Sequence, residues 1–208
     1  MTELATMTTY DPDEIIRKEL TKMTTRERFE TVWEKGDYRR GSTAQRLVPF
    51  LAARIPSGSL INDYGCGTGR AEVLLAARGY RVNMIDIAAN AIEPEAAALL
   101  DRPGWTLTIC PLDGLPGDFP VADWGICINV LMLVDPDRLD AILAEMRRTC
   151  RNLIVEVYDL DDIRLGRNWT RIKGDAAWWS ACLGRFWPTV ESVKSPEHPR
   201  RYITICRS

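Results

Sequence analysis

The chain has 208 residues, a length that fits one α/β domain with a short addition. Hydrophobic residues make up 46 % and charged residues 27 %, and the formal net charge is −2. This balance is typical of a globular protein and excludes an overall basic field of the kind that attracts nucleic acid or anionic membranes. The first ten residues are polar and no stretch is apolar enough to span a bilayer, so we expect neither a signal peptide nor a membrane helix.

The cysteines and the histidine point away from disulfides and metal sites. The six cysteines stand singly, without a CxxC pair, and several lie in apolar runs where a free cysteine behaves as a small hydrophobe. This usage favours a reducing compartment. The only histidine, His198, lies between Pro196 and Pro199, which argues against a zinc site or a Ser-His-Asp triad. We therefore expect a cytoplasmic protein without a metal site.

Helix-like and strand-like segments alternate from about residue 43 onward. A first helix is expected over residues 43–55, followed by a Pro-Ser-Gly breaker. Strands are then expected at 60–64, 80–87, 105–110, 124–130 and 152–158, and helices at 70–78, 88–100 and 136–150. Pro94 must lie near the first turn of the helix over 88–100 or kink it. Strands separated by helices predict a mainly parallel sheet covered on both faces.

The tail differs from this pattern. A helix is expected over 175–186, and two strands over 188–194 and 202–206. Because the connection at 195–201 is rich in proline and charge, these strands are expected to form an antiparallel hairpin at one sheet edge. The predicted fold class is α/β, with a seven-stranded, mainly parallel sheet and a C-terminal antiparallel hairpin.

A glycine-rich segment follows the first expected strand and opens the next helix; it reads Asp63-Tyr64-Gly65-Cys66-Gly67-Thr68-Gly69. Glycines let the backbone turn sharply and let a ligand approach main-chain N–H groups. Asp86 ends the next strand, close to the spacing of about 20 residues expected for a ribose-binding carboxylate. A dinucleotide fingerprint would need glycine where the chain has Arg70, and the Lys-Ser/Thr pair of a P-loop is missing.

The segment Asp63-x-Gly65-Cys66-Gly67-Thr68-Gly69 resembles motif I of class I S-adenosylmethionine-dependent methyltransferases. The resemblance implies a Rossmann-like three-layer αβα sandwich and an enzyme that uses S-adenosyl-L-methionine and releases S-adenosyl-L-homocysteine. In this family the loop contacts the methionine part of the cofactor, and the acid that matches Asp86 holds the ribose. The candidate cofactor-binding residues here are Asp63, Gly65, Cys66, Gly67, Gly69, Asp86 and Ile87.

Two further segments carry the resemblance. The segment at 112–116, with Leu112 and Asp113, is similar to the family segment whose acid meets the adenine amino group, although an ordinary Asp-Gly turn is the alternative. The segment at 123–131 resembles the fourth-strand motif and adds Asn129 and Val130 to the cofactor-binding candidates. The family often continues with Glu-His where this chain has Met132-Leu133, so the roles of that pair are not carried over.

The N-terminal residues 1–42 are expected to form a helical segment that covers the cofactor or the substrate, ahead of a methyltransferase domain at 43–208. In many small methyltransferases of this class a segment with Trp, Tyr and Arg folds over the cofactor here. Tyr38 and Arg40 are the candidates, with Arg40 meeting the cofactor carboxylate. An amphipathic helix that caps the sheet is an equal alternative for Trp33.

Catalytic groups are expected at the carboxyl ends of the strands. Methyl transfer from a sulfonium is an in-line displacement that depends on proximity and alignment, and oxygen or nitrogen acceptors can also need a proton removed. Asn129 ends the fourth strand, and Tyr158 and Asp159 end the fifth. Asp159 is the leading candidate base, and a helix cap is the alternative interpretation of this acid.

The acceptor is expected to be a small molecule. Residues 161–182 combine basic residues with Trp178-Trp179 and form a candidate substrate-binding insertion, in which at least one of the two tryptophans is expected in the core. The sequence lacks the Asn/Asp-Pro-Pro-Tyr/Phe motif and the Pro-Cys pair of enzymes that methylate DNA bases. A nucleic-acid-modifying methyltransferase, a non-catalytic regulatory protein that binds the cofactor, and another use of the same cofactor remain alternatives.

Overall fold

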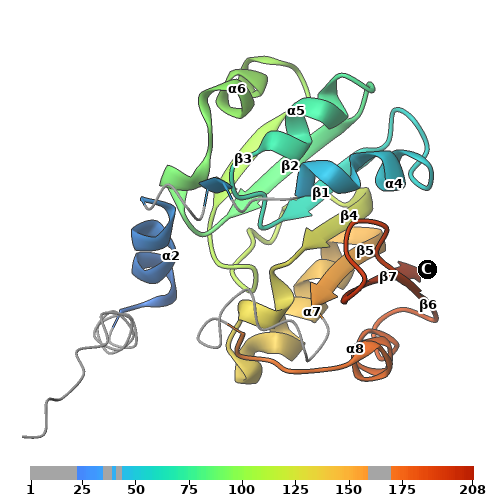
Figure 1. Ribbon diagram of the computed structural model, residues 1–208. Coiled ribbons are helices and arrows are strands. Elements are labelled where there is room, and N and C mark those ends of the chain that lie inside the picture. The colour runs from blue at the N-terminus through green and yellow to red at the C-terminus, as the bar shows by residue number, and fades with distance from the viewer. Residues whose placement is uncertain (1–22, 35–38, 41–43, 159–169) are drawn as a thin grey trace, which may run out of the picture.

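The computed structural model describes residues 23–34, 39–40, 44–158 and 170–208, and these build a seven-stranded sheet (Figure 1). The strand order is β3-β2-β1-β4-β5-β7-β6. The strands are β1 Leu60–Tyr64, β2 Arg81–Asp86, β3 Thr106–Ile109, β4 Ala122–Ile128, β5 Cys150–Tyr158, β6 Thr189–Lys194 and β7 Arg201–Arg207. Strands β1 to β5 pair in parallel, whereas β7 pairs antiparallel with both β5 and β6. The expected fold class is confirmed, including the hairpin at the sheet edge.

Helices cover both faces of the sheet, because each face presents an apolar layer that must be buried (Figure 1). On one face lie α4 Val48–Ala52 and α5 Arg70–Ala76, whose buried side chains Leu51 and Leu75 share a core with Ile61 and Met84. On the other face lie α7 Leu139–Thr149 and α8 Ala176–Leu183. Their core includes Leu143, Met146, Trp179 and Leu183.

The continuous helix expected over 88–100 is wrong. The segment forms η2 Ala89–Ala91, α6 Pro94–Ala97 and η3 Ala98–Asp101. Ile92 and Glu93 between the first two pieces are extended, with ψ angles of 133° and 155°. Proline disfavours the helical conformation in the residue before it, so Pro94 starts a new helix and cannot continue the previous one.

Other expected helices are shorter than predicted. The helix expected over 43–55 is described as η1 Ala44–Leu47 followed by α4. The segment expected over 136–150 begins as η5 Pro136–Arg138 and continues as α7, and another short turn, η4 Leu131–Leu133, follows β4. The proline at position 49 fits the first turn of α4, where its missing N–H needs no helical partner.

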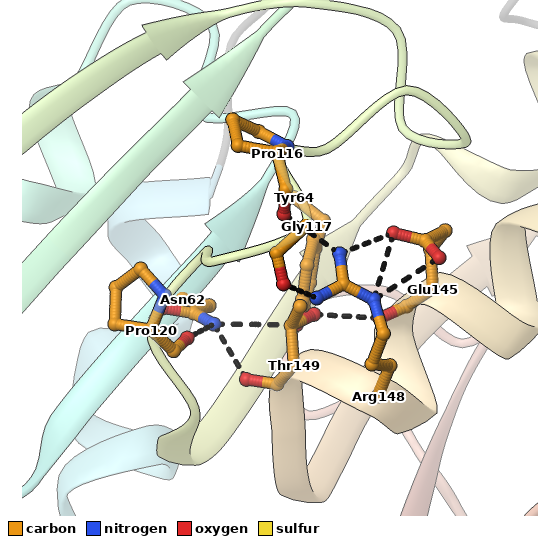
Figure 2. Close-up of polar contacts among 8 residues, drawn as sticks. All are labelled: Asn62, Tyr64, Pro116, Gly117, Pro120, Glu145, Arg148 and Thr149. Carbon is orange, nitrogen blue, oxygen red and sulfur yellow. Dashed lines mark hydrogen bonds and ion pairs between the residues drawn. The ribbon is translucent and has the colours of Figure 1, made fainter.

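Buried polar groups tie the centre of the sheet to the loop before β4 (Figure 2). The Asn62 side chain on β1 donates to the carbonyls of Thr149 at 2.7 Å and Pro120 at 3.2 Å, and the Tyr64 hydroxyl lies 2.7 Å from the Thr149 hydroxyl. Arg148 adds donations of 3.0 Å to the carbonyls of Pro116 and Gly117. The bonds of Asn62 and Tyr64 satisfy polar atoms that would otherwise be buried at a cost, and together with the exposed bonds of Arg148 they anchor the C-terminal end of α7.

None of the helices in the described ranges is long and apolar enough to cross a membrane.

Candidate active site

The glycine loop joins β1 to α5 and takes backbone conformations that favour glycine. Gly65, Gly67 and Gly69 have φ angles of 96°, 55° and 75°. A Cβ at Gly65 would lie 2.4 Å from Cγ2 of Val130, and a Cβ at Gly69 would lie 2.3 Å from Cβ of Ala96. The loop can therefore keep this shape and its contacts with Val130 and Ala96 only without side chains at these positions.

Asp86 holds the loop from the end of β2. Its two carboxylate oxygens accept from the backbone N–H groups of Gly67 at 2.8 Å and Ala88 at 2.9 Å, and the side chain is buried. Burial raises the pKa of Asp86, and these N–H donors oppose the rise. The backbone N–H of Ile87 also bonds to this carboxylate, so of its about four acceptor positions roughly one is left for a ribose hydroxyl. This arrangement fits the cofactor that motif I implies.

A second carboxyl faces Asp63 below the loop, and the sequence analysis missed it. Glu72 lies in the first turn of α5, fully buried and beside the Asp63 carboxyl, and neither of its carboxyl oxygens has a hydrogen-bond donor among the described residues. Burial raises the pKa of both carboxyls, and for Asp63 the charge of Glu72 adds to the rise. Two carboxyls buried side by side repel each other unless one keeps its proton, so we expect the pair to carry a single negative charge. The signal in the sequence was an acid on the inward face of an otherwise apolar helix.

The helix α2 Thr25–Trp33 packs beside η2 and reaches the glycine loop with its last residue. It begins at a capping box in which Thr24 and Glu27 bond reciprocally. Its last residue, Trp33, is buried against Ala88 and Ala91, and two carbons of its ring lie 3.1 Å from the position of a Cβ at Gly67. Trp33 therefore touches the loop as well as capping the sheet.

Arg39 connects the end of α2 to the chain that follows β2. Its guanidinium donates to the carbonyls of Trp33 at 2.8 Å and Ala91 at 2.9 Å, and also to that of Asn90. Arg70 in turn donates to the Arg39 carbonyl at 3.2 Å. Arg40, the candidate expected from the sequence, is exposed, and Arg39 was not among the candidates. Tyr38, the other candidate, lies outside the described residues.

The remaining cofactor candidates lie around the same edge of the sheet. Ile87 packs with Trp33, Cys66 is buried, and Leu112 is buried in the core on the α7 face. Asp113 is bound on both oxygens by Arg138, with one contact of 2.6 Å. The Asp113 carboxylate is thus fixed in place, and its remaining lone pairs stay free for another donor.

At the ends of β4 and β5 the site is built from side chains. Asn129 follows β4 with φ at 61°, and its side-chain Oδ1 is buried without a hydrogen-bond partner among the described residues. Glu156 on β5 is fully buried and bonds to the Asn129 side chain, to Ser195 Oγ at 2.6 Å and to Arg201 Nη1 at 3.4 Å. Glu156 was missed, although an acid inside an apolar strand is a visible signal.

Tyr158, at the end of β5, is buried, and the Arg201 guanidinium carbon lies 4.4 Å from the centre of its ring. Asp159, the expected base, lies outside the described residues. The tryptophan pair divides as expected: Trp179 is 1 % exposed and Trp178 is 43 % exposed.

Known proteins resemble this chain at two levels. Residues 61–152 match the family model of a methyltransferase domain. This stretch contains the glycine loop, Asp86 and Asn129, and it ends within the first residues of β5. No curated protein sequence matches the chain.

Solved structures extend the resemblance beyond that stretch. One is 1,6-didemethyltoxoflavin-N1-methyltransferase from Burkholderia thailandensis with bound 1,6-didemethyltoxoflavin and S-adenosylhomocysteine, at TM-score 0.70 and 20 % identity, covering 100 % of this chain and 93 % of that one. Another is magnesium protoporphyrin IX methyltransferase from Synechocystis PCC 6803 with bound S-adenosylhomocysteine, at TM-score 0.58 and 18 % identity, covering 95 % of each chain. These likenesses show a common fold.

Proposed function

Since residues 61–152 form a methyltransferase domain in a Rossmann-like fold, we propose that this chain binds S-adenosylmethionine at the glycine loop and transfers its methyl group to a nitrogen or oxygen atom of a small molecule. The domain match confirms the family and the enzyme class that motif I indicated. When bound, the cofactor supplies a methyl group that is already activated by the sulfonium charge. The chain's own residues then have to bind and align the two reactants.

One observation carries the cofactor assignment: the Asp86 carboxylate bridges the N–H groups of Gly67 and Ala88 at the carboxyl end of β2. Ligands of open α/β sheets bind at this edge, beside the glycine loop. We assign a ribose hydroxyl to Asp86, the methionine part to the loop from Gly65 to Gly69, and the adenine to the neighbourhood of Leu112 and Asp113.

The small-molecule acceptor is supported by the two similar structures, since the names of both enzymes describe methylation of a small molecule. We place the acceptor at the ends of β4 and β5, where Asn129 and Tyr158 lie. The N-terminal segment would act as a cover through Trp33 and Arg39. The six free cysteines, most of them buried, fit the proposal that the protein works in the reducing cytoplasm.

Calorimetric titration with S-adenosylmethionine and with S-adenosylhomocysteine tests the proposal. We expect binding of both in the micromolar range, weakened about tenfold or more by Asp86→Ala, because that change removes the ribose acceptor and the partner of the Gly67 N–H. The matched control is Asp118→Ala, which removes an exposed carboxylate. Absence of binding to the folded wild-type protein contradicts the proposal.

An acceptor screen follows from binding. The protein and the cofactor are incubated with small molecules that carry N–H or O–H groups, including 1,6-didemethyltoxoflavin. The masses of the products are then measured by mass spectrometry. A gain of about 14 daltons, the mass of one methylene, identifies methyl transfer and separates it from other uses of the cofactor. Cofactor binding without any turnover would favour the regulatory alternative.

A further inference from the structure

Glu156 is a fully buried carboxylate for which the proposed cofactor site has no use. It lies on β5 next to Ile128 of β4 and Ile203 of β7. Three side chains donate to it: Ser195 Oγ at 2.6 Å, Arg201 Nη1 at 3.4 Å and the Asn129 amide. Burying a carboxylate is costly, and a pair of this kind contributes little net stability compared with apolar side chains. Its placement therefore calls for a role other than stability.

Asn129 is held by Glu156 at two points. Its backbone N–H donates to the Glu156 carbonyl at 2.9 Å, and its side-chain amide bonds to the Glu156 carboxylate. The residue also has φ at 61°, and no other non-glycine residue in the described ranges has a positive φ. Left-handed backbone at a non-glycine residue is concentrated at functional sites, where the surrounding structure enforces it.

The chemistry of the two groups fixes which way the Asn129 amide faces. A carboxamide has an NH₂ group that only donates and an oxygen that only accepts, while an ionised carboxylate only accepts. Glu156 must therefore bind Nδ2, which turns Oδ1 away from it. Oδ1 is buried and has no partner among the described residues. A buried acceptor without a donor is costly, so this oxygen is suited to a ligand that brings one.

We propose that Glu156, held by Arg201 and Ser195, is a positioning residue that directs Asn129 Oδ1 toward the methyl acceptor, and that this oxygen selects acceptors carrying an N–H or O–H donor. The inference rests on the proposed function and narrows its acceptor class. An acceptor with no hydrogen to donate would leave Oδ1 unpaired and would be discriminated against.

The C-terminal hairpin takes part in this selection. Ser195 directly follows β6 and Arg201 begins β7, so the hairpin turn between them lies at the same edge of the sheet as the ends of β4 and β5. Arg201 is paired in register with Tyr158. Ser195 and Arg201 both lie outside residues 61–152, the stretch that matches the methyltransferase domain. Asn129 itself thus lies within the family match, whereas the groups that hold it through Glu156 lie in the part of the chain that the match does not cover.

Nitrogen NMR of the full-length ¹⁵N-labelled protein saturated with S-adenosylhomocysteine tests the inference. The Asn129 carboxamide signal is assigned by its loss in Asn129→Ala. Two probes are titrated, 2-pyridone and N-methyl-2-pyridone, which differ by one N–H donor. We expect the first to shift the Asn129 signal and to bind about twofold to tenfold more tightly, the range for one hydrogen bond.

Variants connect this preference to Glu156. Glu156→Gln should abolish the preference, because glutamine can present either a donor or an acceptor to Asn129 and no longer fixes the amide. Glu191→Gln, the same change at an exposed site on β6, should keep it. Arg201→Lys retains the charge with a different geometry and should reduce the preference, which keeps the test informative if Glu156→Gln fails to fold.

The inference is overturned if the wild-type protein binds the two probes equally, or if neither probe shifts its Asn129 signal. It is also overturned if the preference survives in folded Glu156→Gln. Finally, it is overturned if Asn129→Ala binds S-adenosylhomocysteine tenfold more weakly. The last result would assign Oδ1 to the cofactor. Failure of the wild-type protein to bind S-adenosylhomocysteine overturns the proposed function itself, and with it this inference. Cofactor binding without a probe preference overturns only the inference.

Discussion

The candidate site lies at the carboxyl ends of the parallel strands, and its two halves are built in different ways. Around β1 and β2, the backbone forms the site: Asp86 binds the Gly67 N–H of the glycine loop, and the Trp33 ring lies against Gly67. Around β4, β5 and β7, side chains form it: Asn129, Glu156 and Arg201. The first half depends on backbone conformation and tolerates few substitutions. The second half can change its specificity by changing side chains, as expected if one cofactor serves many acceptors.

The largest effect is expected from a substitution in the half of the site around β1 and β2, which is built from backbone. Gly65→Ala places a Cβ 2.4 Å from Val130 Cγ2 at a φ of 96°, so we expect the free energy of unfolding to fall by about 3 kcal/mol and cofactor binding to be lost. Gly58→Ala is the control, since Gly58 has φ at 81° and nothing within 4 Å of its Cβ, and it should cost about 1 kcal/mol. Urea unfolding measures both.

A double variant separates the two causes in Gly65→Ala. Adding Val130→Ala removes the clashing methyl groups and should recover part of the stability, leaving the cost of the positive φ. If Gly65→Ala costs no more than Gly58→Ala, the close approach of the loop to Val130 is not what shapes this half of the site.

The second prediction concerns the carboxyl pair below the loop. Because burial raises the pKa values of Asp63 and Glu72, the folded protein binds protons more tightly than the unfolded chain above the ordinary carboxyl pKa values of about 4. Stability is therefore expected to fall as the pH rises through the raised pKa values. Glu72→Gln should flatten this dependence and raise the free energy of unfolding by about 1 kcal/mol at high pH.

Denaturant unfolding between about pH 5 and pH 9 measures that dependence. Glu95→Gln, which removes an exposed carboxylate from α6, is the control and should leave the slope unchanged. A slope in Glu72→Gln equal to that of the wild type would mean that the pair does not titrate as a unit in this range.

The sequence allowed much of the first half of the site to be predicted and little of the second. Asp63, the glycines and Asp86 lie within two neighbouring strands and their loop, so local patterns sufficed. The break at Pro94 was underestimated: a place in the first turn or a kink was expected, whereas Ile92 and Glu93 before the proline are extended. Glu156, Ser195 and Arg201 meet only through the pairing of β5 with β7, a long-range contact that no local pattern shows. The bonds of Arg39 to the carbonyls of Asn90 and Ala91 depend on local geometry that residue type alone does not determine.

The third prediction concerns Arg39, which holds Trp33 against the half of the site around β1 and β2. Arg39→Met removes the guanidinium that binds the carbonyls of Trp33 and Ala91, so α2 should separate more easily from the loop. We expect S-adenosylhomocysteine affinity to fall about fivefold, the equivalent of roughly 1 kcal/mol. Calorimetry measures the change. Arg78→Met, which removes a surface bond of 3.0 Å to the Leu74 carbonyl, should have no effect on affinity.

The smallest effect is expected in the tail helix of the second half. Trp178 packs edge-on against Trp179, with ring centres 4.9 Å apart, but it remains 43 % exposed, whereas Trp179 is anchored in the core. Trp178→Ala should therefore lower the free energy of unfolding by only about 0.5 kcal/mol. Cofactor affinity should be unchanged, because α8 packs against β6 and β7, which lie at the other end of the strand order from β1 and β2.

Urea unfolding and calorimetry of Trp178→Ala are compared with Val121→Ala, a truncation of a more exposed apolar side chain. A loss of cofactor affinity in Trp178→Ala alone would mean that the tail helix supports the backbone-built half as well, and the division of the site into two independent halves would be wrong. An unchanged affinity, together with the small loss of stability, would mean that the two halves respond separately to mutation.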